Sequence, residues 1–285
     1  MQSLVQLLKR KLETHKGSYG QVVVAGGSPG LTGAVCLCAH AALRIGAGLV
    51  KVAVPQSLHS IFEIKLTEEM STPLADKKGH LSVKAFKTIE KNLDKVSVLV
   101  LGPGAGLEPV TQKLIIKIIK KVAKPLVIDA DGLNALSLDL KSLENKNNQN
   151  LILTPHLGEF SRLTKKKINQ IKEERKELAK KFALRYNLNL ALKGHRTIVT
   201  DGKMIFENNS GNPAMATAGT GDVLSGMIAG LIAQGIDIYE AAKLGVHLHG
   251  LTGDLAAQEK TQSCVIASDL IDYLPKAIKK VSNNG

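Results

Sequence analysis

The clearest pattern in the chain is a series of short runs rich in valine, isoleucine and leucine, separated by polar or glycine-containing segments. Runs of this length without polar alternation are typical of strands that are buried on both faces of a parallel sheet. We therefore predict six buried strands, at Gln21–Ala25, Leu49–Val54, Val96–Leu101, Leu126–Asp129, Leu151–Thr154 and Leu190–Lys193.

Between and after these runs, apolar residues recur at the spacing of a helix face. The predicted helices are Ala34–Ile45, Pro109–Val122, Ile168–Tyr186, Val223–Ala233 and Tyr239–Gln258. Strands that alternate with helices long enough to serve as crossovers are typical of a mostly parallel sheet with helices on both faces. The pattern thus predicts a three-layer α/β/α sandwich.

One pair of runs departs from this pattern. Residues 196–200 and 203–207 alternate apolar and polar positions and are joined by Asp201-Gly202, a dipeptide typical of hairpin turns, so we expect an antiparallel edge there. The α/β rhythm continues from about residue 20 to about residue 275 without a linker rich in Pro, Gly or Ser. We therefore interpret residues 1–285 as one domain, with residues 1–18 as an N-terminal helical extension.

Composition narrows the class of protein. With 285 residues and 44% hydrophobic content, the chain can bury a large core. Lys9, Arg10 and Lys11 interrupt the N-terminal apolar spacing, which is unlike a signal peptide, and no apolar stretch is long enough for a membrane span. The three cysteines lack the spacing of a zinc site and fit free thiols in a reducing compartment. We expect a cytoplasmic protein that does not bind membranes.

The formal net charge of +13 raises the question of a polyanionic partner. Lysines occur in short, separated runs such as 165–167 and 279–280 and form no single stripe. Aromatic residues make up only 3% of the chain, which leaves few platforms for base stacking. We interpret most of this charge as solvated surface and expect no nucleic-acid binding, while a bound polyanion such as a nucleotide stays open.

In open α/β sheets, ligands bind beyond the carboxyl ends of the strands, and three glycine-rich turns follow predicted strands in this chain. The first, residues 26–33, has no lysine before Thr32, which excludes a Walker A loop. The second, residues 102–107, has Leu107 where a dinucleotide-binding fingerprint needs its third glycine, and Pro103 removes an amide. A dehydrogenase-type dinucleotide site is therefore disfavoured.

The third turn, residues 209–222, leads into the apolar helix that begins at Val223. Gly219 and Gly221 allow backbone conformations closed to other residues, and a helix start concentrates free amides, so this turn can grip a phosphoryl group. Asp222 is placed to accept the proton of a hydroxyl that attacks the phosphorus, and we expect the helix terminus to lower its pKa. The alternative is that Asp222 only caps the helix.

Two further polar turns follow predicted strands. Residues 193–197, Lys-Gly-His-Arg-Thr, could hold nucleotide phosphates through an ammonium, a forked guanidinium and a hydroxyl, or could form a polar hairpin rim. Glu159 could reach a magnesium ion through water, or could be structural in the first turn of its helix. His247 and His249 are two residues apart on a predicted helix and point to different faces, so we assign them to packing.

Segments in order along the chain give a more specific identification. They are AALRIGAGLVKVAVP, LGPGAG, VIDADGLNAL, TPHLGEFSRL, ALKGHRT and NNSGNPAMATAGTGDVLSGMIAG. Together they resemble the stand-alone ADP-dependent NAD(P)H-hydrate dehydratase family, a branch of the ribokinase-like kinases, over nearly the whole chain. The resemblance implies a ribokinase-like fold. One departure is that residues 156–159, His-Leu-Gly-Glu, stand where sugar kinases of the superfamily have Asn-x-x-Glu near magnesium, which leaves the role of Glu159 open.

The resemblance also implies roles for individual residues. Contacts to the hydrated dinucleotide would come from Ala42, Gly106, His156 and Asp222. The nucleotide of the phosphoryl donor would lie against Lys193, Gly194, His195, Arg196, Thr197, Gly219, Thr220 and Gly221. The metal would be held indirectly, through water, by Glu159.

The activity implied by the resemblance is that of a lyase that repairs nicotinamide cofactors. ADP would phosphorylate the hydroxyl of the S epimer of hydrated NADH or NADPH, and phosphate would then depart to restore the double bond and leave AMP. Mg²⁺ would be the cofactor, a separate NAD(P)H-hydrate epimerase the functional partner, and a homotetramer the assembly. The open alternatives are a ribokinase-like kinase for a vitamin precursor or sugar alcohol, and a non-catalytic nucleotide- or nucleic-acid-binding protein.

Overall fold

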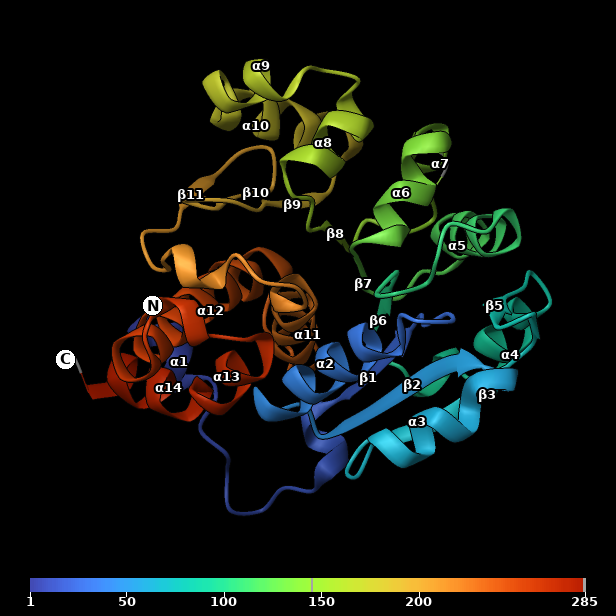
Figure 1. The fold of residues 1–285 in the computed structure, drawn as a ribbon, viewed down its shortest axis with the longest axis horizontal. Helices are drawn as coiled ribbons and strands as arrows, with labels where there is room; N and C mark the ends of the chain where they lie inside the picture. The colour runs from blue at the N-terminus through green and yellow to red at the C-terminus, as the bar shows by residue number, and fades with distance from the viewer. Residues whose placement is uncertain (145, 284–285) are drawn as a thin grey trace.

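The structure, a computed structural model, describes residues 1–144 and 146–283, and is drawn in Figure 1. The expected domain of residues 1–285 includes three residues that lie outside the described ones, namely Asn145, Asn284 and Gly285. Strands β1 to β11 are Gln21–Ala25, Leu49–Pro55, Met70–Leu74, Asp76–Lys77, His80–Leu81, Val98–Leu101, Leu126–Ile128, Leu151–Leu153, Asn189–Leu192, Ile198–Thr200 and Ile205–Glu207. Helices α1 to α14 are Gln2–Gln6, Thr32–Arg44, His59–Lys65, Ala85–Lys91, Pro109–Lys121, Asp131–Leu138, Lys141–Glu144, Leu157–Thr164, Ile168–Glu173, Arg175–Tyr186, Thr220–Ala233, Ile238–Lys260, Ala267–Asp272 and Leu274–Asn283.

Nine of the strands form one sheet in the order β11-β10-β9-β8-β7-β6-β1-β2-β3. The strands from β9 to β3 pair in parallel, and in the centre Val22 of β1 lies opposite Val98 of β6 and Val50 of β2. At the other edge, β9, β10 and β11 pair antiparallel. The predicted mostly parallel sheet with an antiparallel edge hairpin is confirmed.

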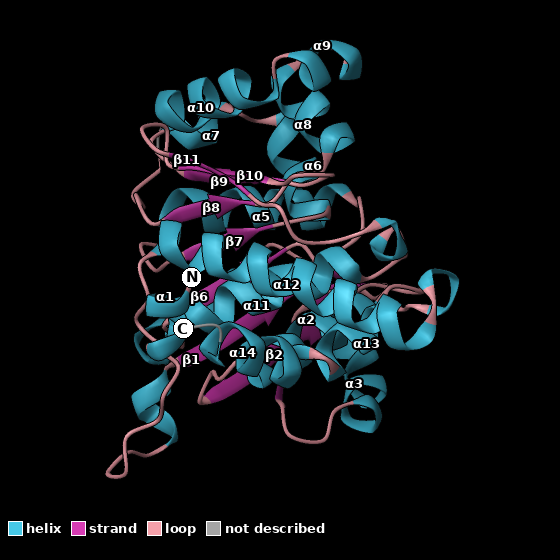
Figure 2. Ribbon diagram, turned by 90° about the vertical axis from the view of Figure 1, so that its left-hand side faces the viewer, coloured by secondary structure: helices cyan, strands magenta, loops and turns pink. Residues whose placement is uncertain are grey.

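The side chains of each central strand alternate between two hydrophobic clusters, one on each face of the sheet. On β1, Val22 and Val24 pack in the cluster that includes α2, α11 and α12, whereas Val23 and Ala25 pack in the cluster that includes α4, α5 and α10. Figure 2 shows helices on both sides of the strands. Because both faces are covered, these strands are apolar at nearly every position, with Gln21 of β1 and Lys51 of β2 as exceptions, and this is why they stand out as hydrophobic runs.

Three features differ from the sequence-based expectation. The helix predicted over residues 168–186 is divided into α9 and α10, because Glu174 between them leaves the helical region at φ −110° and ψ 25°. The N-terminal extension is helical only in α1 and in a 3₁₀ turn at Lys16–Tyr19, since the residues between are mostly exposed and a short helix without packing is marginal. Strand β3 was not predicted from the sequence; it contains Pro73, which is tolerated there because β3 is the edge strand.

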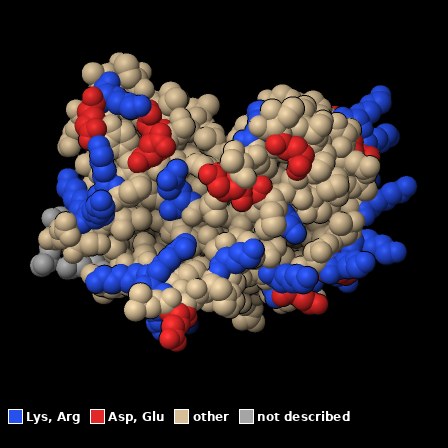
Figure 3. Space-filling model, turned by 90° about the horizontal axis from the view of Figure 1, so that it is seen from below, with Lys and Arg blue, Asp and Glu red and all other residues tan. Residues whose placement is uncertain are grey.

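The surface carries the charge in a dispersed form. On the face shown in Figure 3, Lys and Arg side chains stand at several separate places with Asp and Glu side chains beside them. Among the helices of residues 1–144 and 146–283, none combines the length and the apolar character that a bilayer span requires.

Candidate active site

The strand order changes direction between β1 and β6, and such a reversal is where open α/β sheets bind ligands. The turns that follow these two strands are joined by a hydrogen bond from the Gly27 amide to the Pro103 carbonyl, at 3.0 Å. Gly102, at φ 114°, runs so close to the turn after β7 that a Cβ there would lie 2.0 Å from the Asp129 carbonyl oxygen. The turns after β1, β6 and β7 therefore form one continuous wall.

The turn after β7 carries two aspartates on a strained backbone. Ala130, which lies between them, has φ 50° and ψ −121°, a region nearly closed to residues with a Cβ, at a cost of about 1–3 kcal/mol. On one side of it, Asp131 Oδ2 accepts a hydrogen bond from the Gly106 amide at 2.8 Å. On the other side, Asp129 Oδ1 accepts one from Lys193 Nζ at 2.7 Å. The strained residue thus sets the directions of two carboxylates that contact the predicted site.

Asp129 is the buried anchor of a small polar network. It is only 1% exposed, and its second oxygen accepts a hydrogen bond from Ser225 Oγ of α11 at 2.6 Å. Burial opposes the charged form of Lys193, but attraction to Asp129 and Glu159 outweighs it and raises the pKa of that ammonium. Lys193 therefore stays charged beside Gly221, where a Cβ would lie 3.1 Å from Nζ.

A cavity of about 610 Å³ opens beside this network. Among the residues predicted to bind the nucleotide or the substrate, those that line it are His156, Lys193, Gly194, His195, Arg196, Thr197, Thr220 and Gly221. The opposite wall comes from the segment before α11 and from α12, with Asn208, Ser210, Gly211, Asn212, Pro213, Met215, Val246, His249 and Gly250 among its residues. The structure therefore brings residues 193–197 and two residues of the second predicted nucleotide segment, Thr220 and Gly221, to one hollow, whereas Gly219 does not line it.

The turn that starts α11 has the geometry of an anion-binding helix start. Gly219 is the N-cap residue at φ 89°, a conformation that favours glycine, and a Cβ there would lie 2.6 Å from Leu37 Cδ1. Thr220 Oγ1 donates to the carbonyls of Met215 and Thr217, each at 3.1 Å, which ties the turn to the segment before it. The first amides of a helix have no intrahelical acceptor, so those of α11 are available to a phosphate.

Asp222 lies in the first turn of α11 and does not line the 610 Å³ cavity itself. Burial and the neighbouring Asp129 carboxylate raise the pKa of Asp222 to about 7, although Lys193 acts in the opposite direction. The expectation that the helix terminus lowers this pKa is therefore wrong, because the effect of a helix end is only about 0.3–1 kcal/mol in exposed settings and is outweighed by burial and like charge. A carboxylate that titrates near neutrality is well suited to general-base chemistry.

His156 and Glu159 form a reciprocal cap at the start of α8. His156 Nδ1 accepts from the amides of Gly158 and Glu159 at 3.0 and 3.3 Å, and the His156 amide donates to Glu159 Oε2 at 2.8 Å. Burial and the charges of Lys193 and Arg162 lower the pKa of His156, in keeping with its role as an acceptor. Burial also raises the pKa of Glu159. The capping role that the sequence left open for Glu159 is thus present, and its contact with magnesium stays a prediction.

The remaining predicted substrate residues differ in their placement. Gly106 lies at the switch point of the sheet, where its amide donates to Asp131. The charge of Asp131 in turn contributes to the raised pKa of Asp222, so Gly106 is connected to Asp222 through Asp131. Ala42 is 0% exposed in the last turn of α2 and packs closely against Gly230 of α11. The structure therefore does not bring Ala42 to the cavity, and its contact with a ligand stays a prediction.

Several residues of the site were not identified from the sequence. Asp129 was noted only as the end of a strand, and Asp131 and Ser225 were not considered. Their signal was the position of DAD directly after a predicted strand, where ligand contacts are common. His249 was assigned to packing, and this was incomplete: its Nε2 lies 2.8 Å from the Thr220 carbonyl, and burial lowers its pKa to about 4. A neutral His249 therefore donates to the turn that starts α11.

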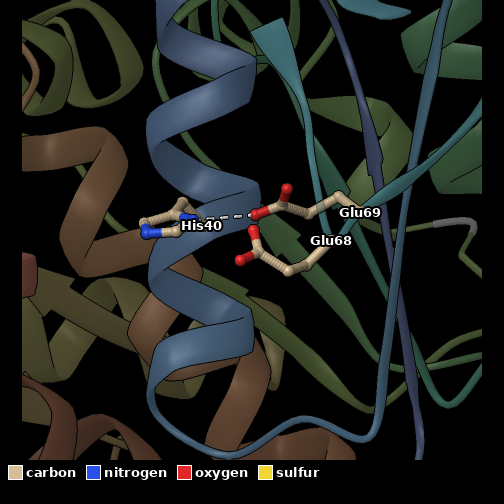
Figure 4. A group of neighbouring side chains, drawn as sticks. All are labelled: His40, Glu68 and Glu69. Atoms are coloured by element: carbon tan, nitrogen blue, oxygen red, sulfur yellow. Dashed lines mark hydrogen bonds and ion pairs between the residues drawn. The ribbon is translucent and has the colours of Figure 1, made fainter.

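A second group of metal-ligating side chains lies elsewhere in the described residues. His40, Glu68 and Glu69 bring one ligand atom each to within 4.8 Å of one another, and Figure 4 shows them converging from α2 and from the segment before β3. A histidine nitrogen with two carboxylates could hold Zn²⁺ or Mn²⁺. Glu69, whose side chain is 2% exposed, already pairs with His40 at 3.0 Å. We interpret this pair as a structural contact that ties α2 to the edge of the sheet.

The comparisons with known proteins can be set against this geometry. The model of a family described as NAD(P)H-hydrate dehydratase matches residues 22–276. Among curated proteins, the chain is 45% identical over 279 residues to the bifunctional NAD(P)H-hydrate repair enzyme Nnr of Moorella thermoacetica, which covers 97% of this chain and 52% of that protein. The chain therefore spans about half the length of the curated relatives it matches.

Solved structures give the same picture. The ADP/ATP-dependent NAD(P)H-hydrate dehydratase from Bacillus subtilis, co-crystallised with ATP/Mg²⁺, superposes with a TM-score of 0.81 at 27% identity over 96% of this chain and 94% of that chain. A ribokinase-like superfamily protein from Enterococcus faecalis superposes with a TM-score of 0.79 at 27% identity over 98% of this chain and 95% of that chain. The predicted ribokinase-like fold is confirmed.

Proposed function

The chain belongs to the NAD(P)H-hydrate dehydratase family, and we propose on that premise that it dehydrates the S epimer of hydrated NADH and NADPH at the expense of ADP. The products would be the reduced cofactor, AMP and phosphate. The observation that supports this most directly is the position of Asp222. A carboxylate with a pKa of about 7 lies in the first turn of α11, next to Lys193 and to the cavity that Gly221 lines.

The first step would be phosphoryl transfer. The hydroxyl oxygen on the saturated nicotinamide ring attacks the terminal phosphorus of ADP, the bond from that phosphorus to the bridging oxygen breaks, and AMP leaves. Asp222 accepts the hydroxyl proton. The amides at the start of α11 and the Lys193 ammonium stabilise the negative charge on the transferred group.

The second step would be elimination. The ring nitrogen lone pair assists departure of phosphate from the ring carbon, and loss of a proton from the adjacent carbon forms the double bond. Phosphate leaves far more readily than hydroxide, which is the chemical reason for coupling a dehydration to nucleotide cleavage. The oxygen of the original hydroxyl therefore ends in inorganic phosphate.

The two ligands would occupy the two halves of the site. Residues 193–197 and 219–221 would hold the nucleotide, and Gly106, His156 and Asp222 would contact the hydrated ring, while Ala42 rests on the family resemblance alone. Glu159 fits a water-mediated magnesium site, since its carboxylate lies within electrostatic reach of Lys193 and Asp129 and this ion keeps part of its hydration shell. When bound, magnesium would neutralise part of the charge on the nucleotide phosphates.

We also propose the cellular setting. The curated relatives are named as bifunctional repair enzymes and are about twice as long as this chain, which supports an epimerase as its functional partner. Residues 1–285 would form a single domain, and the protein would assemble as a homotetramer. It would act in the cytoplasm, where Cys36, Cys38 and Cys264 would stay free thiols.

The direct test is to mix the purified protein with hydrated NADH, ADP and Mg²⁺. We expect the nicotinamide absorbance to recover, with AMP and phosphate formed in equal amounts, and ¹⁸O in the substrate hydroxyl to appear in phosphate. Recovery with ATP would measure the donor preference. A folded protein that binds ADP but yields a stable phosphorylated product would support the kinase alternative, and one that yields no product would contradict the proposed enzyme.

A further inference from the structure

The β4–β5 hairpin brings a histidine to the substrate half of the site, although no sequence motif singled it out. The hairpin turn is formed by Lys78 at φ 52° and Gly79 at φ 81°, and the Gly79 amide donates to Asp76 Oδ2 at 2.9 Å. A Cβ at Gly79 would lie 2.7 Å from Pro29 Cγ, so the hairpin packs directly on the turn after β1. His80, the first residue of β5, is thereby held at the switch point of the sheet.

His80 has a buried nitrogen without a partner. Among the described residues, no hydrogen-bonding atom pairs with His80 Nδ1, which is shielded from solvent although the residue as a whole is half-buried. Leaving a buried polar atom unpaired costs about 1–3 kcal/mol, so such atoms are uncommon outside functional sites. An unpaired ring nitrogen in a ligand-binding region indicates a partner that arrives with the ligand.

This nitrogen lies beside Gly106, which the family resemblance assigns to the hydrated dinucleotide. A Cβ at Gly106 would lie 3.2 Å from His80 Nδ1 and 3.1 Å from Ser28 Oγ. The Ser28 hydroxyl already donates to the Gly104 carbonyl at 2.9 Å. The Gly106 amide, in turn, donates to Asp131, whose charge acts on Asp222. His80 is thus connected through Gly106 to the reacting centre, and it is not among the residues that line the nucleotide cavity.

We propose that His80 binds the carboxamide of the saturated nicotinamide ring through Nδ1. This inference rests on the proposed function. The ring carries two polar substituents, and its hydroxyl is committed to Asp222 and the incoming phosphorus. The carboxamide remains, and because it offers both a donor and an acceptor, it can pair with Nδ1 in either tautomer of the histidine. His80 is therefore a substrate-binding residue that orients the ring so that its hydroxyl points to Asp222.

The test separates the two ligands of the enzyme. His80→Phe keeps a flat ring and removes the nitrogen, and we expect it to raise KM for hydrated NADH about tenfold while KM for ADP changes less than about twofold. His80→Asn places an amide near the position of Nδ1 and should restore most of the affinity. His15→Phe, an exposed histidine near the N-terminus, is the matched control and should leave both constants unchanged.

Binding measurements keep the test independent of turnover. Calorimetric titration with hydrated NADH and with NADH should show weaker binding to His80→Phe than to the wild type, with ADP binding equal in both. Thermal unfolding checks that each variant is folded, and His80→Leu, which also lacks the nitrogen, provides a second variant if the Phe protein is not. If folded His80→Phe or His80→Leu binds hydrated NADH as the wild type does, the inference is wrong. A wild type that binds these ligands without any turnover contradicts the proposed function instead.

Discussion

The Lys193 ammonium lies 2.7 Å from the buried Asp129 carboxylate. The two side chains come from the ends of β9 and β7, and the same ammonium lies beside Gly221 at the start of α11. One cation therefore joins the sheet to the turn that starts α11. Its charge also acts on Glu159 and Asp222, where it lowers the pKa, but burial and the Asp129 carboxylate outweigh it and raise the pKa of both groups.

Asp222→Asn should separate catalysis from binding. Removing the proton acceptor should lower kcat by about 10²–10⁴-fold, the usual contribution of a general base, because an amide cannot take the hydroxyl proton. The shape of the turn is retained, so the Kd for ADP measured by calorimetry should stay within about threefold of the wild-type value. This change is well below the loss of affinity expected when a buried hydrogen bond to a charged group is removed. Asp201→Asn, in the hairpin between β10 and β11, is the control and should turn over as the wild type does. A nearly active Asp222→Asn protein would reduce Asp222 to a structural helix residue.

The rate should depend on pH through Asp222. Because a base must be deprotonated and the pKa of Asp222 is raised to about 7, log kcat/KM should rise with unit slope below pH 7 and level off above it. His249, with its pKa lowered to about 4, stays neutral across this range and adds no limb. The variant Glu159→Gln keeps the capping geometry and removes the other carboxyl group whose pKa is raised. The rise of log kcat/KM below pH 7 should persist in that variant, and its loss there would assign this pH dependence to Glu159.

The same shift predicts how stability depends on pH. Asp222 has a folded pKa near 7 and an ordinary value of 3.8, so the folded state holds this proton more tightly than the unfolded chain does. Its contribution to stability is therefore complete below pH 3.8 and is lost as the pH rises to about 7. Chemical denaturation at several pH values should show a steeper fall in the free energy of unfolding between pH 4 and 7 for the wild type than for Asp222→Asn. Equal slopes would mean that the carboxyl is solvated in the folded protein.

Ala130→Gly should stabilise the protein. Relief of a backbone strain of about 1–3 kcal/mol exceeds the extra entropy that glycine gives the unfolded chain, about 0.5–1 kcal/mol, so the free energy of unfolding should rise. Ala257→Gly, inside α12, is the opposing control and should destabilise by about 1 kcal/mol. Urea denaturation of both variants measures the difference. A loss of stability in Ala130→Gly would show that the position is not strained.

The sequence predicted the parts of this molecule that local patterns determine. Gln21–Ala25 was predicted to the residue because four consecutive apolar residues follow Gln21 and the strand is flanked by Gly20 and Gly26. The β4–β5 hairpin that carries His80 was not predicted, because strands of only two residues show no hydrophobic periodicity in the sequence. The pKa of Asp222 was predicted in the wrong direction because Asp129, which raises it, is 93 positions away in the sequence. Only the fold brings the two carboxylates together. Contacts between distant segments were therefore the part that the sequence alone could not supply.

The contact between His249 and the turn that starts α11 gives the last prediction. His249 Nε2 donates to the Thr220 carbonyl at 2.8 Å, and the same helix fixes the opposite wall, because Asp254 Oδ2 accepts from the Gly211 amide at 2.9 Å. His249→Phe should leave the Thr220 carbonyl without its donor and let the turn drift from the geometry that transfer requires. Misplacement of about 1 Å can cost 10²-fold, so we expect kcat to fall by at least about tenfold, with a smaller change in KM for hydrated NADH.

Two variants decide whether this effect belongs to the hydrogen bond. His249→Gln carries an amide nitrogen near the position of Nε2 and should recover much of kcat, whereas a residue needed only to fill space would not be rescued by a polar chain of different shape. His247→Phe, two residues earlier on α12, is the matched control, because its side chain makes no hydrogen bond to the turn among the contacts of residues 1–144 and 146–283. Steady-state kinetics at saturating ADP measures all three. If His249→Phe is folded and keeps the wild-type kcat, the turn at Thr220 holds its shape without α12, and the free amides of α11 alone must position the phosphoryl group.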